Sequence, residues 1–181
     1  YPDRIHQADV TPEFKYMLDR KLQWSSKRHI MYFDIETWFD PENPKANMPH
    51  KALMPVTSIV CYSNFHKKYW VISWHPEQTK DYDEPKMIEE DNVNYMLCKD
   101  EETVLLSFLE LLSVMQTDII TGWYSGGYDL PYIINRCKRL GLPYENISPL
   151  KDVYIKKRGE YWRINIKGLD HVDMMDAVQD M

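Results

Sequence analysis

Two carboxylates alternate along an apolar stretch near the start of the sequence. Residues 31–37 read MYFDIET, and residues 30–35 are apolar or aromatic except for Asp34, which favours a buried strand. Alternate side chains of a strand share one face, so we expect Asp34 and Glu36 to project together. Neighbouring carboxylates at a buried strand repel each other and lose hydration. A divalent cation with hard oxygen ligands would compensate for both effects.

The same pattern has a simpler interpretation, in which Glu36 is a solvated residue just beyond the strand. An Asp-x-Glu triplet is expected by chance about once in so acidic a chain, so a third carboxylate is needed to favour a metal site. Asp129 is a candidate, because it follows a glycine-containing loop at residues 122–127 and precedes a predicted helix. Taken alone, Asp129 is better explained as the N-terminal cap of that helix.

The composition is that of an ordinary globular domain. The 181 residues are enough for one domain with a sizeable core. The net charge of −6 argues against a broad basic surface for duplex DNA, although bound cations can neutralise an acidic site locally. Cys61, Cys98 and Cys137 show no paired metal-ligand spacing, which favours buried thiols in a reduced, intracellular setting such as the cytoplasm. No membrane-spanning run or signal peptide is visible.

Apolar periodicity predicts the elements that would position the carboxylates. Two helices are expected: residues 100–116, with Asp100 as the cap and an apolar stripe that includes Phe108, and a second from Asp129 to just before Gly141. The predicted strands are residues 30–35, 56–63, 68–74, 118–121, 153–155, 161–166 and 169–172. Strands come early and then alternate with helices, which indicates an α/β domain with a mixed sheet.

The remaining stretches are predicted to be connections. The proline-punctuated residues 38–55 should lack regular structure, and the acidic residues 76–92 should form a surface loop. Residues 1–28 are expected to be an extended lead-in with a short helix beginning at Thr11. The chain begins with Tyr and stops where a new helix is predicted, so we expect a fragment of a longer protein.

Two segments of the chain resemble the first two exonuclease motifs of family B DNA polymerases. Residues 33–37 (FDIET) look like the first motif, and residues 121–133, which include Tyr128-Asp129-Leu130-Pro131, are similar to the second. The order of the motifs, their separation and the intervening helix also fit. Residues 8–13 and 148–176 resemble the flanking segments, the latter most of all in the T-even phage branch. The resemblance therefore covers nearly the whole chain.

This resemblance implies a ribonuclease-H-like fold, a mixed β-sheet flanked by helices over residues 29–181, and a 3′→5′ exonuclease that edits DNA synthesis. The family uses two divalent cations, Mg²⁺ or Mn²⁺, around the scissile phosphate. Carried onto this chain, Asp34 would bridge the cations, and Glu36 would bind one of them and help hold the attacking water. Asp129 would bind the second cation.

The second motif also supplies candidate contacts to DNA. Tyr124 stands where the family usually carries Asn, which helps fix the loop and the nucleotide end; Tyr124 therefore either stacks on a base or marks a divergent loop. Tyr128, directly before Asp129, either packs in the core or contacts the terminal nucleotide. Thr37, the last residue of the first motif, is a further candidate for DNA binding.

Basic and aromatic residues outside the motifs have two interpretations each. Lys156, Lys157 and Arg158 form either a solvated hairpin tip or a contact to the phosphate backbone near the primer end, since family members use a hairpin here to keep the strands apart. Trp38 and Phe39 either stack on unpaired bases or cover the core.

A third motif of the family, a Tyr with an Asp four residues later, is not found downstream of Asp129. Asp173 and Asp176 are the late carboxylates nearest to it, and we expect structural roles for both. The sequence therefore predicts a fragment that binds metal weakly and cuts DNA slowly or not at all. Its partners would be a single-stranded or frayed primer 3′ end and the remainder of the polymerase. The alternatives are a stand-alone exonuclease and a non-catalytic nucleic-acid-binding or scaffold module.

Overall fold

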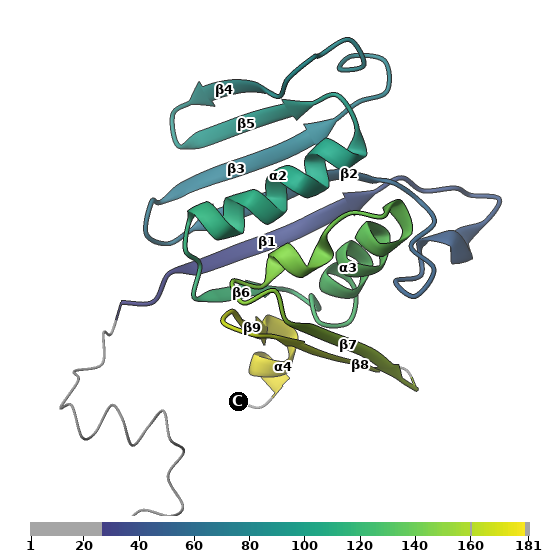
Figure 1. Ribbon diagram of the computed structural model, residues 1–181, viewed down its shortest axis with the longest axis vertical. Helices are drawn as coiled ribbons and strands as arrows, with labels where there is room; N and C mark the ends of the chain where they lie inside the picture. Colours follow the sequence, from purple (N-terminus) through teal and green to yellow (C-terminus); the bar gives the residue numbers. More distant parts are fainter. Residues whose placement is uncertain (1–26, 160, 180–181) are drawn as a thin grey trace, which may run out of the picture.

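The computed structural model of the protein describes residues 27–159 and 161–179 (Figure 1). The predicted lead-in of residues 1–28, with its helix at Thr11, lies outside these residues except for its last two. Within the described residues, seven strands form one sheet in the order β4-β5-β3-β2-β1-β6-β9. The strands are β1 (Ile30–Thr37), β2 (Val56–Ser63), β3 (Lys68–Trp74), β4 (Lys86–Glu90), β5 (Val93–Cys98), β6 (Ile119–Gly122) and β9 (Asp170–Asp173).

The sheet is mixed, as the order of the predicted elements indicates. Strand β1 is antiparallel to β2 and parallel to β6, which in turn is parallel to β9. Along β1, Met31, Phe33 and Ile35 are buried, whereas Asp34 and Glu36 are exposed on the opposite face. The two carboxylates therefore share one face of the strand, as predicted.

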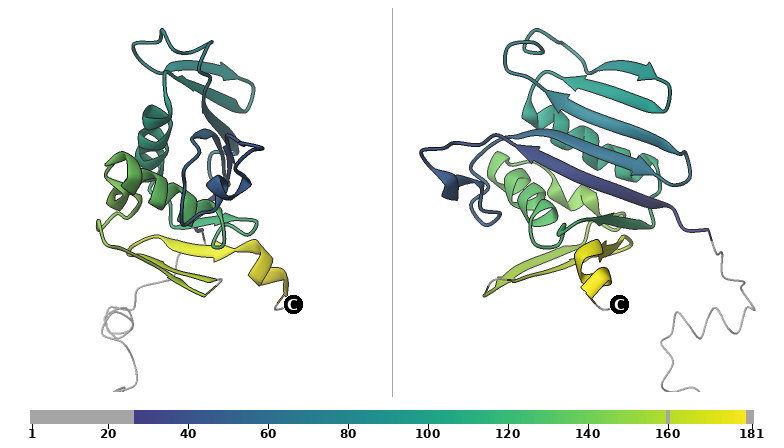
Figure 2. Two further views of the ribbon diagram at one scale, coloured as in Figure 1. Left: turned by 90° about the vertical axis from the view of Figure 1, so that its right-hand side faces the viewer. Right: turned by 180° about the vertical axis from the view of Figure 1, so that it is seen from behind.

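Two helices cover one face of the sheet, α2 (Glu101–Val114) and α3 (Asp129–Leu140). Figures 1 and 2 show both on the same side, and the right-hand view of Figure 2 shows the side that they leave uncovered. Asp100 caps α2 by accepting a hydrogen bond from the Thr103 amide at 2.9 Å, as predicted. The ring of Phe108 stacks on Phe33 of β1 at a centroid distance of 5.9 Å. The core lies between α2, α3 and the sheet.

A buried ion pair ties these two helices to the segment that leads into β2. Arg136 of α3 forms two hydrogen bonds of 2.7 Å with the carboxylate of Glu101 at the start of α2. The same carboxylate accepts a hydrogen bond from the Val56 amide at 2.7 Å. Arg136 also donates to the carbonyl groups of Ala52 and Leu53. Both charged groups of this ion pair are hydrogen-bonded, so the network fixes the position of α3 relative to the sheet.

The prediction of a surface loop across residues 76–92 is wrong in part. Strand β4 occupies residues 86–90 and pairs antiparallel with β5, and all five of its side chains are exposed. An edge strand is held by backbone hydrogen bonds to one neighbouring strand and needs no buried face. Strand β4 therefore lacks the apolar alternation that would predict a strand from the sequence. Similarly, a short 3-10 helix, η2 (Pro44–Asn47), lies in the segment expected to lack regular structure.

The basic residues predicted at a hairpin tip lie within a strand instead. Strand β7 (Val153–Arg158) pairs with β8 (Tyr161–Ile166), so residues 156–158 continue the ladder and the turn begins at Gly159. Gly159 has a positive φ of 62°, which glycine adopts without strain. A short 3-10 helix, η3 (Tyr144–Ile147), lies between α3 and the hairpin. Strand β8 of the hairpin contacts β9, and α4 (Met174–Gln179) follows β9.

The three cysteines are free and buried, as predicted. Burial raises the pKa of the Cys98 thiol to about 11 and that of Cys137 to about 12, so both thiols are protonated near neutral pH. No helix within the described residues has the length and apolar character needed to cross a membrane.

Candidate active site

Asp34 lies beside the point where two strands of the sheet separate. Its neighbour across the antiparallel ladder is Val60 of β2. On the other side, β1 pairs with β6 only as far as Tyr32 and Thr121. Beyond that pair, α3 begins where β6 would have continued, so the start of the helix faces the unpaired edge of β1. Asp34 and Glu36 project from this part of the strand.

Asp129, the first residue of α3, is buried and contacts this unpaired edge. Its Oδ1 atom accepts a hydrogen bond from the Ile35 amide at 3.3 Å. The capping interpretation of Asp129 is wrong, because Tyr128 occupies the cap position and makes no side-chain capping bond. Burial raises the pKa of Asp129 to about 7, and the charge of Asp34 is the second cause of the increase. Asp34 and Asp129 are therefore close enough to repel each other.

Carboxylate oxygens are suitable ligands for a hard divalent cation. The structure brings together two of the three predicted residues, Asp34 and Asp129. Oxygen ligands are those that Mg²⁺ and Mn²⁺ prefer, and a nearby cation would remove the repulsion that raises the pKa of Asp129. The third residue, Glu36, is exposed on β1. Over residues 27–159 and 161–179, no three His, Cys, Asp or Glu side chains form a group that could hold a metal ion.

Two glycines allow the loop before α3 to bring Asp129 to β1. A Cβ atom at Gly122 would lie 2.6 Å from the Phe33 carbonyl oxygen, so only glycine fits between β6 and β1. At Gly127, an added Cβ would lie within 2.2 Å of the ring of Tyr124, which packs over that glycine. Tyr124 has a φ of 53°, in the left-handed region that Asn tolerates better than Tyr. The Asn usual in the family would therefore suit this backbone.

Strand β9 holds the same loop from its other side. Asp173 accepts a hydrogen bond from the Gly126 amide at 2.8 Å and another from the Met175 amide at 3.0 Å, which is the structural role predicted for it. A nitrogen of the His171 ring lies 2.9 Å from the Ser125 hydroxyl. No local pattern singles out His171, because its partner lies 46 residues away. Asp173 also contributes to the raised pKa of Asp129.

The predicted DNA-binding residues Thr37 and Tyr128 form one polar cluster with Asn47. The Thr37 hydroxyl lies 3.3 Å from the Tyr128 hydroxyl. Asn47 of η2 donates to Thr37 Oγ1 at 2.8 Å and to the Trp38 carbonyl at 2.7 Å. The ring of Tyr128 also packs on Tyr132 and against the core, as the first interpretation predicts, and contact with the terminal nucleotide stays a prediction. Sequence reasoning missed Asn47, since it lies in the proline-rich segment without a recognisable pattern.

Trp38 and Phe39 are exposed by 51% and 59%, so the interpretation that they cover the core is wrong. Tyr124 is also exposed, by 45%. All three rings follow or line the segments that carry the carboxylates, so they are available to a ligand at this site.

A family model supplies the identification that the geometry alone leaves open. The model for the DNA polymerase family B exonuclease domain matches residues 6–181. The chain belongs to this family. Its mixed sheet with α2 and α3 is the ribonuclease-H-like fold that the sequence predicted.

Curated relatives support the same assignment. The chain is 29% identical over 140 residues to the protein named DNA polymerase beta of African swine fever virus (isolate Warthog/Namibia/Wart80/1980), a match that covers 76% of the chain and 11% of the relative. It is 21% identical over 178 residues to a DNA polymerase of Pyrococcus glycovorans, covering 97% of the chain and 20% of the relative. A DNA polymerase delta catalytic subunit of Candida albicans is 29% identical over 91 residues, 44% of the chain and 9% of the relative. The chain thus spans a fifth or less of these relatives.

Proposed function

We propose that this chain is the proofreading part of a family B DNA polymerase, a 3′→5′ exonuclease that hydrolyses the last phosphodiester bond of an unpaired DNA 3′ end. The observation that carries the proposal is the convergence of Asp34 on β1 and the buried Asp129 on α3, in a chain that the family model matches almost completely. DNA synthesis would belong to the remainder of the polymerase and not to these residues.

Asp34, Glu36 and Asp129 would hold two divalent cations, Mg²⁺ or Mn²⁺. When bound, such cations lower the pKa of the attacking water and stabilise charge on the attacking and departing oxygens. Asp129 is fixed for this role by the Ile35 amide. Glu36, exposed at the end of β1, is free to accept a hydrogen bond from the attacking water and so to orient it.

The residues around the carboxylates would hold the DNA end. The hydroxyl groups of Thr37 and Tyr128 can donate hydrogen bonds to the terminal nucleotide, and Asn47 fixes the position of the first. The exposed rings of Trp38 and Tyr124 are suited to stacking on unpaired bases. Lys156, Lys157 and Arg158 on the hairpin would contact phosphate groups.

The proposed partners are the single-stranded or frayed 3′ end of a primer and the rest of the polymerase chain, in an intracellular replication protein. The affiliation with the T-even phage branch is part of this proposal, and it rests on the resemblance of residues 148–176 alone. Since the described residues bring two of the three carboxylates together and not the third, we expect slow hydrolysis by this chain on its own.

Titration of Mn²⁺ by calorimetry and digestion of a 5′-labelled single-stranded oligonucleotide test the proposal together. The wild-type chain should bind Mn²⁺ and release nucleotides slowly from the 3′ end. Asp34→Ala and Asp129→Ala should lose both properties, and Asp81→Ala, at an exposed position of the segment before β4, should keep them. Mn²⁺ binding that is unchanged in Asp34→Ala would contradict the proposal and favour a non-catalytic nucleic-acid-binding module.

A further inference from the structure

A contact between two basic side chains joins the hairpin to the segment that follows the first motif. The Nζ atom of Lys157 on β7 donates to Nδ1 of His50 at 3.3 Å, although the two residues are 107 positions apart. Lys51 follows His50, and its carbonyl accepts a hydrogen bond from Nε of Arg139 at 3.3 Å. Three separate segments therefore bring four basic side chains to one region of the surface. We call His50, Lys51, Arg139 and Lys157 the basic junction.

Within residues 27–159 and 161–179, the cationic side chains of the basic junction form no ion pair with a carboxylate. The ion pairs in the described part of the chain lie elsewhere, and none of them includes Lys51, Arg139 or Lys157. The loss of hydration at the contact, and then the charges of Lys157 and Lys51, lower the pKa of His50. Such repulsion is notable in a chain with a net charge of −6. An anion placed between these side chains would relieve it.

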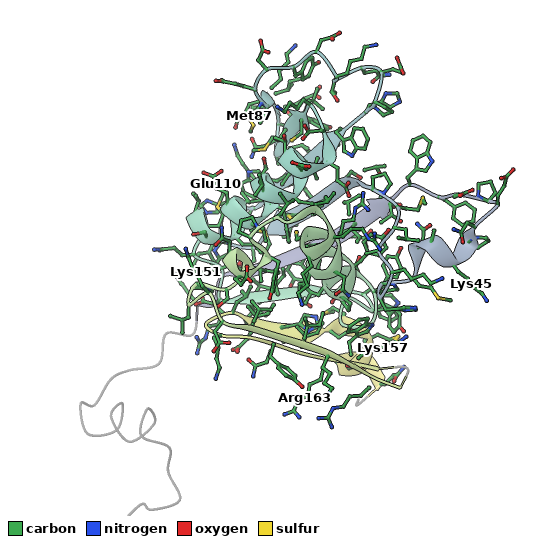
Figure 3. The ribbon with its side chains drawn as sticks, turned by 45° about the vertical axis from the view of Figure 1, so that its right-hand side comes forward. Lys45, Met87, Glu110, Lys151, Lys157 and Arg163 are labelled. Carbon is green, nitrogen blue, oxygen red and sulfur yellow. The ribbon has the colours of Figure 1, made fainter. Side chains whose placement is uncertain are left out.

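The basic junction lies close to the candidate active site along the chain. Asn47, which contacts Thr37 at 2.8 Å, precedes His50 by three residues, and three residues span at most about 11 Å. Figure 3 shows Lys157 and Lys45 of η2 on the same side of the molecule, whereas Lys151 lies on the opposite side. A strand that leaves the carboxylates past Thr37 would thus meet the basic junction next.

We propose that the basic junction binds phosphate groups of single-stranded DNA behind the 3′-terminal nucleotide. Residues 50–51, the end of α3 and β7 would each supply part of this site. Phosphate oxygens would accept hydrogen bonds from Lys51, Lys157 and Arg139, and a bound phosphate would favour protonated His50. The inference rests on the proposed function for the direction of the strand, and it extends the phosphate contact of Lys157 to a site that includes His50, Lys51 and Arg139.

Fluorescence anisotropy with a 5′-fluorescein oligothymidylate in EDTA measures this binding without hydrolysis. Lys51→Gln and Lys157→Gln should each weaken binding several-fold. Each should also reduce the slope of log affinity against log salt by about 0.7, the value for one phosphate contact on a single strand. Lys151→Gln is the matched control, since it removes one exposed lysine on the other side of the molecule, and it should bind like the wild type.

Two results would overturn the inference. The first is that Lys51→Gln and Lys157→Gln have the same affinity and salt slope as Lys151→Gln. The second is that the wild-type chain shows no salt-dependent binding. Nucleotide release in Mn²⁺ separates this inference from the proposed function. Loss of affinity in the lysine variants with no release by the wild type supports the basic junction and contradicts the exonuclease. Nucleotide release that depends on Asp34, with unchanged binding by the lysine variants, supports the exonuclease and contradicts the basic junction.

Discussion

The backbone amide of Ile35 donates a hydrogen bond to the carboxylate of Asp129, 94 residues further along the chain. Ile35 lies between Asp34 and Glu36, so this single bond places the buried carboxylate beside the strand that carries the other two. The bond is possible because β6 stops pairing with β1 at Tyr32 and leaves the Ile35 amide free. The separation of two parallel strands therefore creates the position that Asp129 fills.

Replacement of Asp129 by Asn should stabilise the metal-free protein in a pH-dependent way. The pKa of this carboxyl group is raised from 3.8 to about 7 in the folded chain, so the native state binds the proton more tightly than the unfolded state. The stability that this proton contributes is present at low pH and is lost as the pH rises to about 7. Because Asn never ionises, Asp129→Asn should gain a few kcal/mol over the wild type above pH 7.

Thermal unfolding in EDTA at a series of pH values measures this gain. The difference in Tm between Asp129→Asn and the wild type should grow from pH 4 to pH 7 and then level off. Mg²⁺ should reduce the difference by stabilising the wild type. A difference that is independent of pH would mean that folding does not raise the pKa of Asp129.

Substitution of Gly122 by Ala should destabilise the fold and displace the loop that carries Asp129. The new Cβ atom would lie 2.6 Å from the Phe33 carbonyl oxygen, and a backbone atom in a central strand cannot move aside cheaply. We expect a loss of about 1–3 kcal/mol. Gly126→Ala is a graded control, because its nearest contacts, at 3.0 and 3.2 Å, are side-chain atoms of His171 and Asp173.

Urea unfolding gives the two free energies, and Mn²⁺ titration reports on the site. Gly122→Ala should lose more stability than Gly126→Ala and should also bind Mn²⁺ more weakly. Equal stability of the wild type and Gly122→Ala would mean that β6 and β1 are further apart than described.

The elements around the site could be predicted because their signals are local. The alternation along β1, the cap at Asp100 and the glycine after α3 each act within a few residues, and these elements lie where the sequence indicates. Strand β4 was missed because its backbone, and not its exposed side chains, makes the stabilising contacts. Asn47 and His50 were missed because their partners are distant in sequence or are backbone atoms.

Breaking the ion pair between Arg136 and Glu101 should destabilise the protein strongly. Arg136→Met would leave the Glu101 carboxylate buried without its partner, at a cost of about 3–5 kcal/mol. It would also leave the carbonyl groups of Ala52 and Leu53 without their donor. Lys138→Met, at an exposed position of the same helix, is the matched control; it removes only the contact of the ammonium with the Tyr144 ring, 4.5 Å from its centroid, and should cost about 1 kcal/mol or less.

Chemical denaturation of the single variants and of a double variant with Glu101→Gln tests the origin of this loss. The second substitution removes the uncompensated charge, so the double variant should recover part of the stability lost in Arg136→Met. If it recovers none, the cost comes from packing or from the carbonyl groups and not from the buried charge.

Tyr124 offers a direct test of base stacking at the site. Its backbone is in the left-handed region, with a φ of 53°, and its ring packs over Gly127. Tyr124→Asn should relieve backbone strain and lose ring packing, so we expect a net change in stability within about 1 kcal/mol. If the ring stacks on a base, the substitution should weaken oligonucleotide binding by about 1–3 kcal/mol.

Tyr124→Phe is the control, because it keeps the stacking surface and removes only the hydroxyl group. Anisotropy should therefore rank the affinity of Tyr124→Phe near that of the wild type and well above that of Tyr124→Asn. The exposed position of the ring, beside a loop fixed by Asp173 and His171, supports this ranking, because a stacking surface is most effective when its backbone is already held in place. Equal affinities of the Asn and Phe variants would mean that the ring packs against the loop and does not stack on a base.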